Sequence, residues 1–369
     1  MTLNGILSIK RTLLSRTLPY DVAKEKPEIV PLDELLQIDR LPFKMTKATM
    51  LEVAYMGQLM LSYESASIEL EKKLGYEIST TLVREVTVYV GEFVYQNDFN
   101  IALETQGNLT SSIEYGKKRA KGSLYIMIDG AAINTRVEDK NGSGWRENKL
   151  AMSFASINVI KRGSSEKNGY RIIKKEYTAY IGSSTDFAKF VYQIAINQGY
   201  GKYEETIILS DGAIWIRNMC EEIFPDAIQI LDKYHLIENI YNFGKSIFRN
   251  NEERYKPWRE KMIKYIEKNQ IEKAISEVDK IKKIDESVVN LKTYLRNNRD
   301  KINYREYIKK GYYIGSGAIE SANKVILQKR LKQSGMRWSV ESAQAVLTLR
   351  AKVESGLWTT VVKPLIMKL

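Results

Sequence analysis

The sequence predicts an α/β protein in which a mixed sheet is preceded by a helical domain and interrupted by an all-helical insertion. Apolar runs rich in strand-forming residues are confined to residues 121–235. Helical periodicity without strand signals fills residues 46–120 and the lysine-rich residues 236–310. Residues 311–369 begin with a glycine-punctuated turn and are expected to complete the sheet domain with basic C-terminal helices.

Five strands are expected within residues 121–235, carried by the segments SLYIMIDG, KLAMSFASINVI, GYRIIKKEYTAYIG, ETIILSDG and DAIQILDKYH. Helical segments separate the last three strands and follow the fifth, which gives the element order βββαβαβα. The first three strands can form an antiparallel meander, and the last two can join in parallel through helical crossovers.

The N-terminal part of the chain is expected to be mostly helical. Residues 1–45 are predicted to hold short strands and connectors, because ILSIKRTLL is strand-like and four prolines interrupt the remainder. In residues 46–120, Gly75 ends one helix and Ser79 or Thr80 caps the next. This outline fits a helix-turn-helix DNA-binding domain, and it fits an ordinary helical bundle equally well.

The positive charge of the chain is concentrated in its C-terminal third. The net charge is +12, and residues 241–369 hold 28 Lys and Arg against 14 Asp and Glu. A surface of this kind is typical of proteins that bind a polyanion such as nucleic acid. Solvated lysine-rich helices are the alternative interpretation.

Cysteine usage and hydropathy indicate the cellular compartment. The single cysteine, Cys220, excludes a disulfide framework and a cysteine-based zinc site, and it fits a reducing cytoplasm. No stretch approaches the roughly 18 apolar residues of a membrane span, and the basic N-terminus lacks the long apolar region of a signal peptide. We expect a cytoplasmic, nucleoid-associated protein without a membrane partner.

Two aspartates end apolar strand segments in matching contexts. Asp129 ends YIMID and Asp211 ends IILSD, and each is followed by Gly-Ala. Ligands bind at the carboxyl ends of strands in open α/β sheets, and the small residues let a substrate backbone approach. Taken alone, either aspartate could instead cap the turn that follows it.

A third acidic residue follows the glycine turn. Glu320 lies in GSGAIESANK, on the first turn of a helix, where the helix dipole also favours an acid. Three carboxylates without cysteine ligands select a hard ion, Mg²⁺ with Mn²⁺ as a substitute. Two such ions about 3.5–4 Å apart can support in-line displacement at phosphorus. We therefore expect Asp129, Asp211 and Glu320 to bind two metal ions.

The only histidine, His235, follows Asp232 in the segment LDKYHLIEN. His235 is expected to orient a scissile phosphate or carry a proton, and a structural hydrogen bond to Asp232 is the alternative. With one histidine and no G-x-S-x-G elbow, a serine hydrolase is not expected. The absence of G-x-x-x-x-G-K-[ST] argues against a P-loop nucleotidase.

Basic residues cluster after Glu320 and have tryptophans near them in the sequence. Phosphate contacts and base stacking are expected from Lys324, Lys329, Arg330, Lys332, Arg337, Trp338 and Trp258. The alternatives are a solvated basic helix face for the cations and a core position for Trp258.

The order of these motifs resembles that of DDE transposases with a ribonuclease-H-like core, and within them the Lre-type group of bacterial insertion sequences, related to Mutator-like transposases. The resemblance covers roughly residues 120–350 and lies in YIMIDGAAINTR, WRENKLAM, ILSDGAIWIRN, ILDKYHLIENI, GYYIGSGAIESANK and SGMRWSVESAQAVL. It implies a ribonuclease-H-like sheet, Mg²⁺-dependent cleavage and transfer of DNA strands, binding to terminal inverted repeats and target DNA, and a homodimer or higher oligomer.

The resemblance also implies roles for individual residues. Asp129, Asp211 and Glu320 would be the metal ligands, and Asp232 with His235 would match an accessory motif. Two other functions remain open: a metal-dependent nuclease on the same core, and a decayed transposase that only binds DNA. Strand-transfer assays separate the first from a transposase, and DNA binding that needs no Mg²⁺ would indicate the second.

Overall fold

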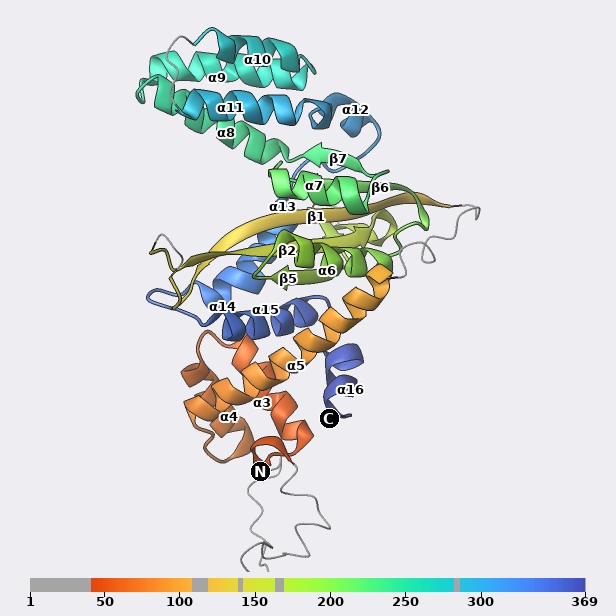
Figure 1. Cartoon of the computed structure of the whole chain (residues 1–369), viewed down its shortest axis with the longest axis vertical. Helices are drawn as coiled ribbons and strands as arrows, with labels where there is room; N and C mark the ends of the chain where they lie inside the picture. The colour runs from red at the N-terminus through yellow and green to blue at the C-terminus, as the bar shows by residue number, and fades with distance from the viewer. Residues whose placement is uncertain (1–40, 108–118, 139–141, 163–168, 282–285, 369) are drawn as a thin grey trace, which may run out of the picture. The chain divides into compact units, whose positions relative to one another are not determined.

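A computed structural model describes residues 41–107, 119–138, 142–162, 169–281 and 286–368 (Figure 1). The chain divides into two compact units, one of residues 1–97 with 328–369 and one of residues 98–327. The strands expected in residues 1–45 fall almost wholly outside the described residues.

The first unit is helical and joins the two ends of the chain in one core. Its elements are η2 (Pro42–Lys44), α3 (Lys47–Leu59), α4 (Tyr63–Leu74), the first part of α5 (Thr80–Gly107), α14 (Lys329–Leu331), α15 (Val340–Glu354), η6 (Trp358–Val362) and α16 (Lys363–Ile366). Met50 and Val90 from the N-terminal helices pack in one buried cluster with Leu349, Val362 and Ile366. The last forty residues therefore build a helical core, whereas the sequence placed them with the sheet.

Local signals in the sequence account for the ends of these helices. Gly75 follows α4 with a φ of 76°, a left-handed conformation that favours glycine. The Ser79 hydroxyl accepts a hydrogen bond from the Leu82 N–H at 3.2 Å at the start of α5. Close packing also needs glycine at Gly57, where a Cβ atom would meet Thr87 Oγ1 at 2.0 Å. The helices are thus fixed by caps and by one close approach.

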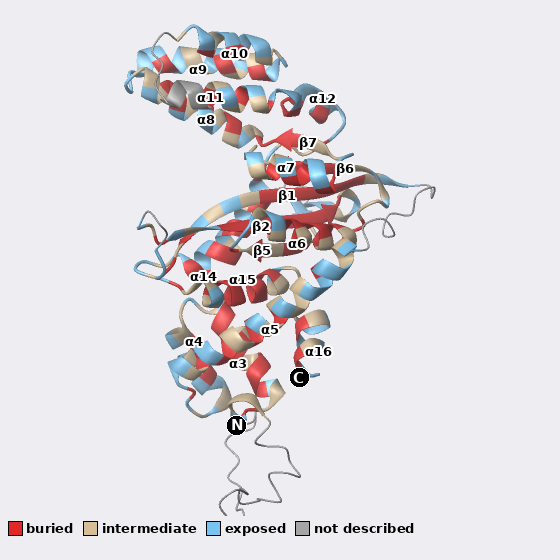
Figure 2. Cartoon of the chain, in the orientation of Figure 1, coloured by how far each residue is buried: buried red, intermediate tan, exposed pale blue. Residues whose placement is uncertain are grey.

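The second unit contains a mixed five-stranded sheet in the order β5-β2-β1-β6-β7. Its strands are β1 (Ala120–Asn134), β2 (Trp145–Ala155), β5 (Glu176–Tyr180), β6 (Tyr203–Ser210) and β7 (Ile228–Leu231). β2 pairs antiparallel with β1 and with β5, while β6 pairs parallel with β1 and with β7. The expected α/β class and mixed sheet are confirmed, and the middle of β1 and most of β2 are buried (Figure 2).

Two expected strands each divide into two shorter ones. After β2, the turn η3 (Ser156–Asn158) leads into β3 (Val159–Arg162), which pairs with β4 (Gly169–Ile172) in a separate hairpin. The apolar residues Ile160 and Tyr170 on this hairpin are 45% and 56% exposed. The prediction of two long strands was wrong here, because part of each segment forms strands that do not enter the core.

The two faces of the sheet are covered differently. On one face, α6 (Ser184–Asn197) and α7 (Ile214–Ile223) pack an apolar cluster that includes Ile126, Ile208, Phe187 and Cys220. On the other face, α13 (Gly317–Ala322) packs against β1 and β2. The Tyr313 ring lies 5.0 Å from the Tyr125 ring, between centroids, on this second face. The chain after the insertion thus returns to the sheet.

The all-helical insertion lies between β7 and α13, as the sequence predicted. Its elements are α8 (Lys233–Ile247), α9 (Glu252–Glu267), α10 (Ile271–Asp279), α11 (Glu286–Asn297), η4 (Arg299–Lys301) and α12 (Tyr304–Lys309). After α13, a π-helical turn, η5 (Asn323–Gln328), continues toward α14. Within the described part of the chain, no helix combines the length and the apolar character needed to cross a membrane.

Candidate metal and nucleic-acid site

The register of the parallel strands β1 and β6 places Asp129 and Asp211 beside each other. Met127 on β1 is paired with Leu209 on β6, and each aspartate lies two residues beyond its member of that pair. Neighbouring strands are about 4.8 Å apart, and residues two apart along a strand point to the same face. The two carboxylates therefore start from adjacent positions on one face. The sequence predicted that Asp129 ends its strand, whereas β1 continues past it to Asn134 and only Asp211 follows a strand end.

Each of the two aspartates also accepts a hydrogen bond from a backbone N–H that follows it in the sequence. Asp129 Oδ1 accepts a hydrogen bond from the Gly130 N–H at 2.8 Å, and Asp211 Oδ1 accepts one from the Ala213 N–H at 2.9 Å. Gly212 has a φ of 83°, and a Cβ atom there would meet the Leu231 side chain at 2.6 Å. Gly212 thus serves a tight turn after Asp211, whereas Gly130 continues β1, and each carboxylate keeps its second oxygen for another partner.

The electrostatic surroundings of Asp129 show which groups are its neighbours. Burial raises the pKa of Asp129 above its ordinary value. The Gly130 N–H, the Asn323 amide and His235 act to lower this pKa, while the charge of Asp211 raises it further. Two carboxylates that repel each other in this way would be stabilised by a shared cation.

The segment after the glycine turn reaches Asp129 through an amide. The Asn323 Nδ2–H donates a hydrogen bond to Asp129 Oδ2. Glu320 lies one helical turn earlier, and its Oε1 accepts a hydrogen bond from the Ser316 hydroxyl at 2.6 Å. The helix that carries Glu320 is therefore fixed against β1, while its carboxylate is bound to its own turn.

The expected three-carboxylate ligand set is not assembled. Among the residues that the structure describes, no group of three or more His, Cys, Asp or Glu side chains is placed to hold a metal ion. Asp129 and Asp211 are neighbours, but Glu320 does not join them. The available donors still fit Mg²⁺ by type, since carboxylate and amide oxygens are its preferred ligands. Asn323 Oδ1 is such an oxygen, and it is buried without a hydrogen-bond partner.

Asp232 is a positioning residue that joins three segments of the chain. Its side chain is fully buried, and its Oδ1 caps α8 by accepting the His235 backbone N–H at 2.7 Å. Asp232 Oδ2 accepts the Ser316 N–H, and the Asp232 N–H donates to the Ser210 carbonyl at 2.8 Å. The expected catalytic role is corrected here, because both carboxylate oxygens are occupied inside the protein.

His235 lies on the first turn of α8 beside the strand ends. Its link to Asp232 uses the backbone N–H, so the imidazole is not fixed by that carboxylate. Nδ1 lies 3.8 Å from Glu238 Oε2, and Nε2 is buried without a hydrogen-bond partner. Since His235 affects the pKa of Asp129, the imidazole is near that carboxylate and has a nitrogen available for another group.

Tyrosines of the insertion brace the strand ends, which the sequence did not indicate. The Tyr294 hydroxyl donates to the Asp211 carbonyl, and the Tyr304 hydroxyl donates to the Leu231 carbonyl, both at 2.9 Å. Burial raises the pKa of both phenols, so they stay protonated as donors. Only their position on otherwise lysine-rich helices could have suggested this role.

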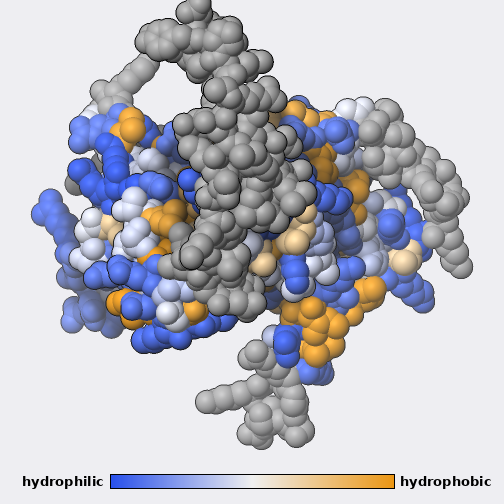
Figure 3. Space-filling view, turned by 90° about the horizontal axis from the view of Figure 1, so that it is seen from below, coloured by the Kyte–Doolittle hydropathy of each residue, from blue (hydrophilic) through white to orange (hydrophobic). Residues whose placement is uncertain are grey.

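The expected DNA-contacting residues divide into exposed and buried ones. Exposed side chains belong to Lys324, Lys329, Lys332 and Arg337. Hydrophilic residues dominate much of the surface seen from below, with smaller apolar areas between them (Figure 3). The exposed cations remain candidates for phosphate contacts.

Arg330 and Trp338 are core residues of the helical unit, which corrects the expectation that they contact DNA. Arg330 is 1% exposed, and its guanidinium donates to the Gly57 and Leu61 carbonyls, both at 3.3 Å. It also lies over the Tyr63 and Trp338 rings, at 4.4 and 5.0 Å from their centroids. The Trp338 indole N–H is bound to a backbone carbonyl as well. These groups are buried and bonded within the fold.

Trp258 lies on α9 and packs within the insertion. Its ring centroid is 5.5 Å from that of Phe243 and 6.0 Å from that of Phe248. A Cβ atom at Gly244 would meet the Trp258 ring at 3.2 Å, so the helices approach closely here. The core interpretation of Trp258 therefore accounts for its contacts.

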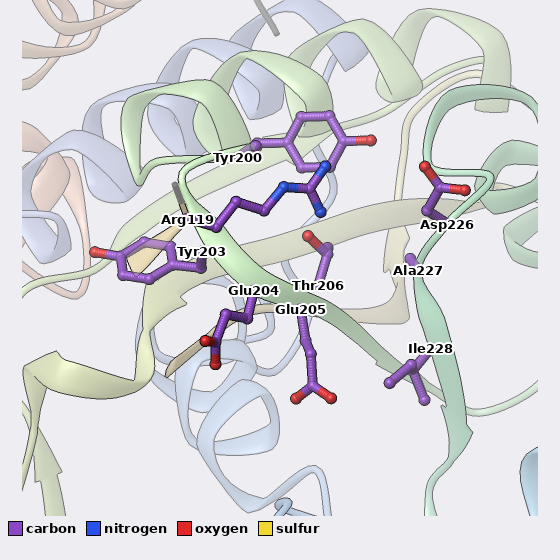
Figure 4. A pocket seen from close by; sticks show the side chains of 10 residues that line it. Arg119, Tyr200, Tyr203, Glu204, Glu205, Thr206, Asp226, Ala227 and Ile228 are labelled. Atoms are coloured by element: carbon purple, nitrogen blue, oxygen red, sulfur yellow. The ribbon is translucent and has the colours of Figure 1, made fainter. Parts of the chain in front are cut away.

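A small pocket lies at the other ends of the same strands. It is lined near the starts of β6 and β7 by residues that include Arg119, Tyr200, Glu205 and Asp226 (Figure 4). The Glu205 carboxylate accepts a hydrogen bond from the Tyr312 hydroxyl at 2.5 Å. Because Asp211 follows the carboxyl end of β6, the pocket near the start of β6 is separate from the candidate site.

Comparisons with known proteins give the chain a family without assigning a reaction. None of the curated proteins compared with the chain matches its sequence. A family model matches residues 15–363, which is nearly the full length. The chain therefore belongs to the uncharacterised protein family UPF0236.

Proposed function

We propose that this protein is a DNA transposase of the DDE type that cleaves and transfers the ends of a mobile element. The observation that carries the proposal is the in-register placement of Asp129, inside β1, beside Asp211, which directly follows the end of the adjacent parallel strand β6. The helix that carries Glu320 is held against the same strand through Asn323. This convergence joins segments nearly 200 residues apart in the sequence.

Asp129 and Asp211 would hold Mg²⁺, and Glu320 would complete the set when its carboxylate leaves the Ser316 hydroxyl. When bound, two divalent ions supply activation of a water or 3′-hydroxyl nucleophile and stabilisation of the leaving oxygen. The His235 Nε2 atom, buried and unpartnered, would contact the scissile phosphate or carry a proton. Asp232 would keep α8 and the glutamate turn in place.

The proposal extends to the fold and to the partners. An antiparallel meander followed by two parallel strands is the arrangement expected of a ribonuclease-H-like core. Residues 241–369 hold 28 Lys and Arg against 14 Asp and Glu, and this positive charge supports binding to the DNA backbone. Terminal inverted repeats of the element and its target DNA would be the substrates, and a homodimer or higher oligomer would pair the two ends.

The test uses the full chain with linear DNA that carries the element's own ends. Cleavage and joining to a target should require Mg²⁺ or Mn²⁺, and Asp129→Ala, Asp211→Ala and Glu320→Ala should each abolish both reactions while DNA binding persists. Asp226→Asn is the matched control, because this exposed aspartate precedes β7 at the other end of the sheet. If the Asp211→Ala variant keeps full metal-dependent cleavage, the proposal fails. Cleavage without joining would indicate a nuclease instead.

A DNA-binding protein without catalysis is the second candidate. It is favoured by the local roles of the aspartates, since Asp129 and Asp211 each accept a nearby backbone N–H and both carboxylate oxygens of Asp232 are bound inside the fold. DNA binding without Mg²⁺, unchanged in Asp211→Ala and accompanied by no cleavage, would support it. Both candidates require affinity that falls steeply with salt, because phosphate contacts release counterions.

A further inference from the structure

We propose that Asn323 is a metal ligand of the candidate site and that it occupies the place of the ion in the free protein. This inference rests on the proposed function and extends it to a residue outside the three carboxylates. In the structure, the Asn323 Nδ2–H donates to Asp129 Oδ2. The partially positive N–H group of Asn323 thus lies against the carboxylate oxygen that a cation would bind.

The other atom of the amide has no partner. Asn323 is 3% exposed, and its Oδ1 is buried without a hydrogen bond. Leaving such an acceptor unpaired is unfavourable, so a purely structural amide would be expected to satisfy both atoms. An amide oxygen is also a suitable donor for Mg²⁺ or Mn²⁺. The unpaired atom therefore has the right chemistry for a cation beside Asp129.

A second buried amide lies on the same face of the sheet. Asn148 on β2 is opposite Ala131, two residues beyond Asp129 on β1, and it is fully buried. Neither of its amide atoms has a hydrogen-bond partner. Since α13 packs on β1 and β2 here, this region contains several polar atoms that lack partners inside the protein. The cluster is built for a polar ligand.

The state of Glu320 explains why an amide is needed. Its carboxylate is bound to the Ser316 hydroxyl, and no set of three acidic or histidine ligands forms among the described residues. We infer that a cation between Asp129 and Asp211 replaces the Asn323 N–H at Asp129 Oδ2. The amide would turn over so that Oδ1 faces the ion, and Asn323 would serve as an oxygen ligand in addition to the carboxylates.

The test measures Mn²⁺ binding to the full chain by electron paramagnetic resonance, which reports the free ion without requiring activity. Asn323→Ala should lower the affinity about 10–100-fold, the range seen when supporting groups of metal sites are removed. Asn323→Asp should match or exceed the wild-type affinity, because it keeps an oxygen ligand. If the amide served only as a hydrogen-bond donor to Asp129, Asn323→Ala would free that oxygen and leave Mn²⁺ affinity unchanged or higher.

Controls separate this inference from the proposed function. Asn218→Ala, an exposed amide on α7, should leave Mn²⁺ affinity unchanged. Binding that needs Asp211 but is unaffected by Asn323→Ala would overturn the role of Asn323 and leave the proposed function standing. A wild-type chain that binds no Mn²⁺ would overturn both. Thermal unfolding of each variant without metal shows that the compared chains are folded, and Asn323→Ser replaces Asn323→Ala if that variant is not.

Discussion

The two faces of the sheet differ in how completely their side chains are satisfied. The face under α6 and α7 is a closed apolar cluster that includes Ile126, Ile208 and Cys220. The face under α13 contains Asp129, Asn148 and buried amide atoms without partners. One strand, β1, contributes to both faces through alternate residues. We therefore expect changes on the first face to affect mainly stability and changes at the polar groups of the second face to affect mainly the proposed site.

The largest contrast is expected from Asp129→Asn. Cleavage should fall by more than about 100-fold, since loss of a supporting group alone often costs 10–100-fold at metal sites. The free energy of unfolding at neutral pH should not decrease, because the raised pKa of Asp129 shows that the fold disfavours its charged form. Cleavage assays and urea unfolding measure the two effects. A large loss of stability would show that the carboxylate supports the fold.

The opposite result is expected from Ile208→Ala on the closed face. Ile208 is 1% exposed, and truncation of such a residue costs about 3 kcal/mol of unfolding free energy. Cleavage per folded molecule should stay unchanged. Ile160→Ala on the exposed hairpin is the control, with an expected loss below about 0.5 kcal/mol in the same urea titration. Loss of activity in folded Ile208→Ala molecules would mean that the two faces are coupled.

Asn148→Leu should raise stability, which is unusual for a change in a core. Removing two unpaired buried polar atoms relieves a penalty of about 1 kcal/mol or more. Chemical unfolding measures this gain, and Asn148→Asp should shift it in the other direction by burying a charge. If Asn148→Leu is less stable than the wild type, the amide has a partner inside the folded protein.

The smallest effect is expected at Cys220. Burial raises the pKa of the Cys220 thiol to about 12. The side chain lies on α7 and is fully buried in the apolar cluster of α6, α7 and the sheet. Iodoacetamide at about pH 8 should therefore leave the native chain unmodified and react fully in urea, as mass spectrometry can show. Modification under native conditions would indicate that the closed face opens.

The neighbouring positions of the two aspartates were predictable from the sequence because they depend on local pattern, although the end of β1 at Asn134 was not. The apolar runs before Asp129 and Asp211 predicted two strands, and parallel pairing then aligned the aspartates. The extra hairpin was missed because β-branched and aromatic residues do not reveal whether a strand is buried. Burial of Ile160 or Tyr170 depends on contacts that no short window contains.

Side-chain partners were harder to predict than elements. A run of cations with a nearby tryptophan fits a DNA surface, yet Arg330 and Trp338 pack on Tyr63, which is over 260 residues away in the sequence from either. The motif GSGAIESANK drew attention to Glu320, whereas the contact with Asp129 is made by Asn323. Which residue of a helix faces the sheet depends on how the helix is placed, and residue type alone does not fix it.

The carboxylate of Asp232 has a mechanical consequence. One oxygen accepts a hydrogen bond from the first turn of α8, and the other accepts one from the Ser316 backbone. The helical insertion and the turn before Glu320 are therefore joined through one side chain. A movement of the helical insertion would be transmitted to that turn through these two hydrogen bonds. A partner that moves the helical insertion would thus also change the position of Glu320.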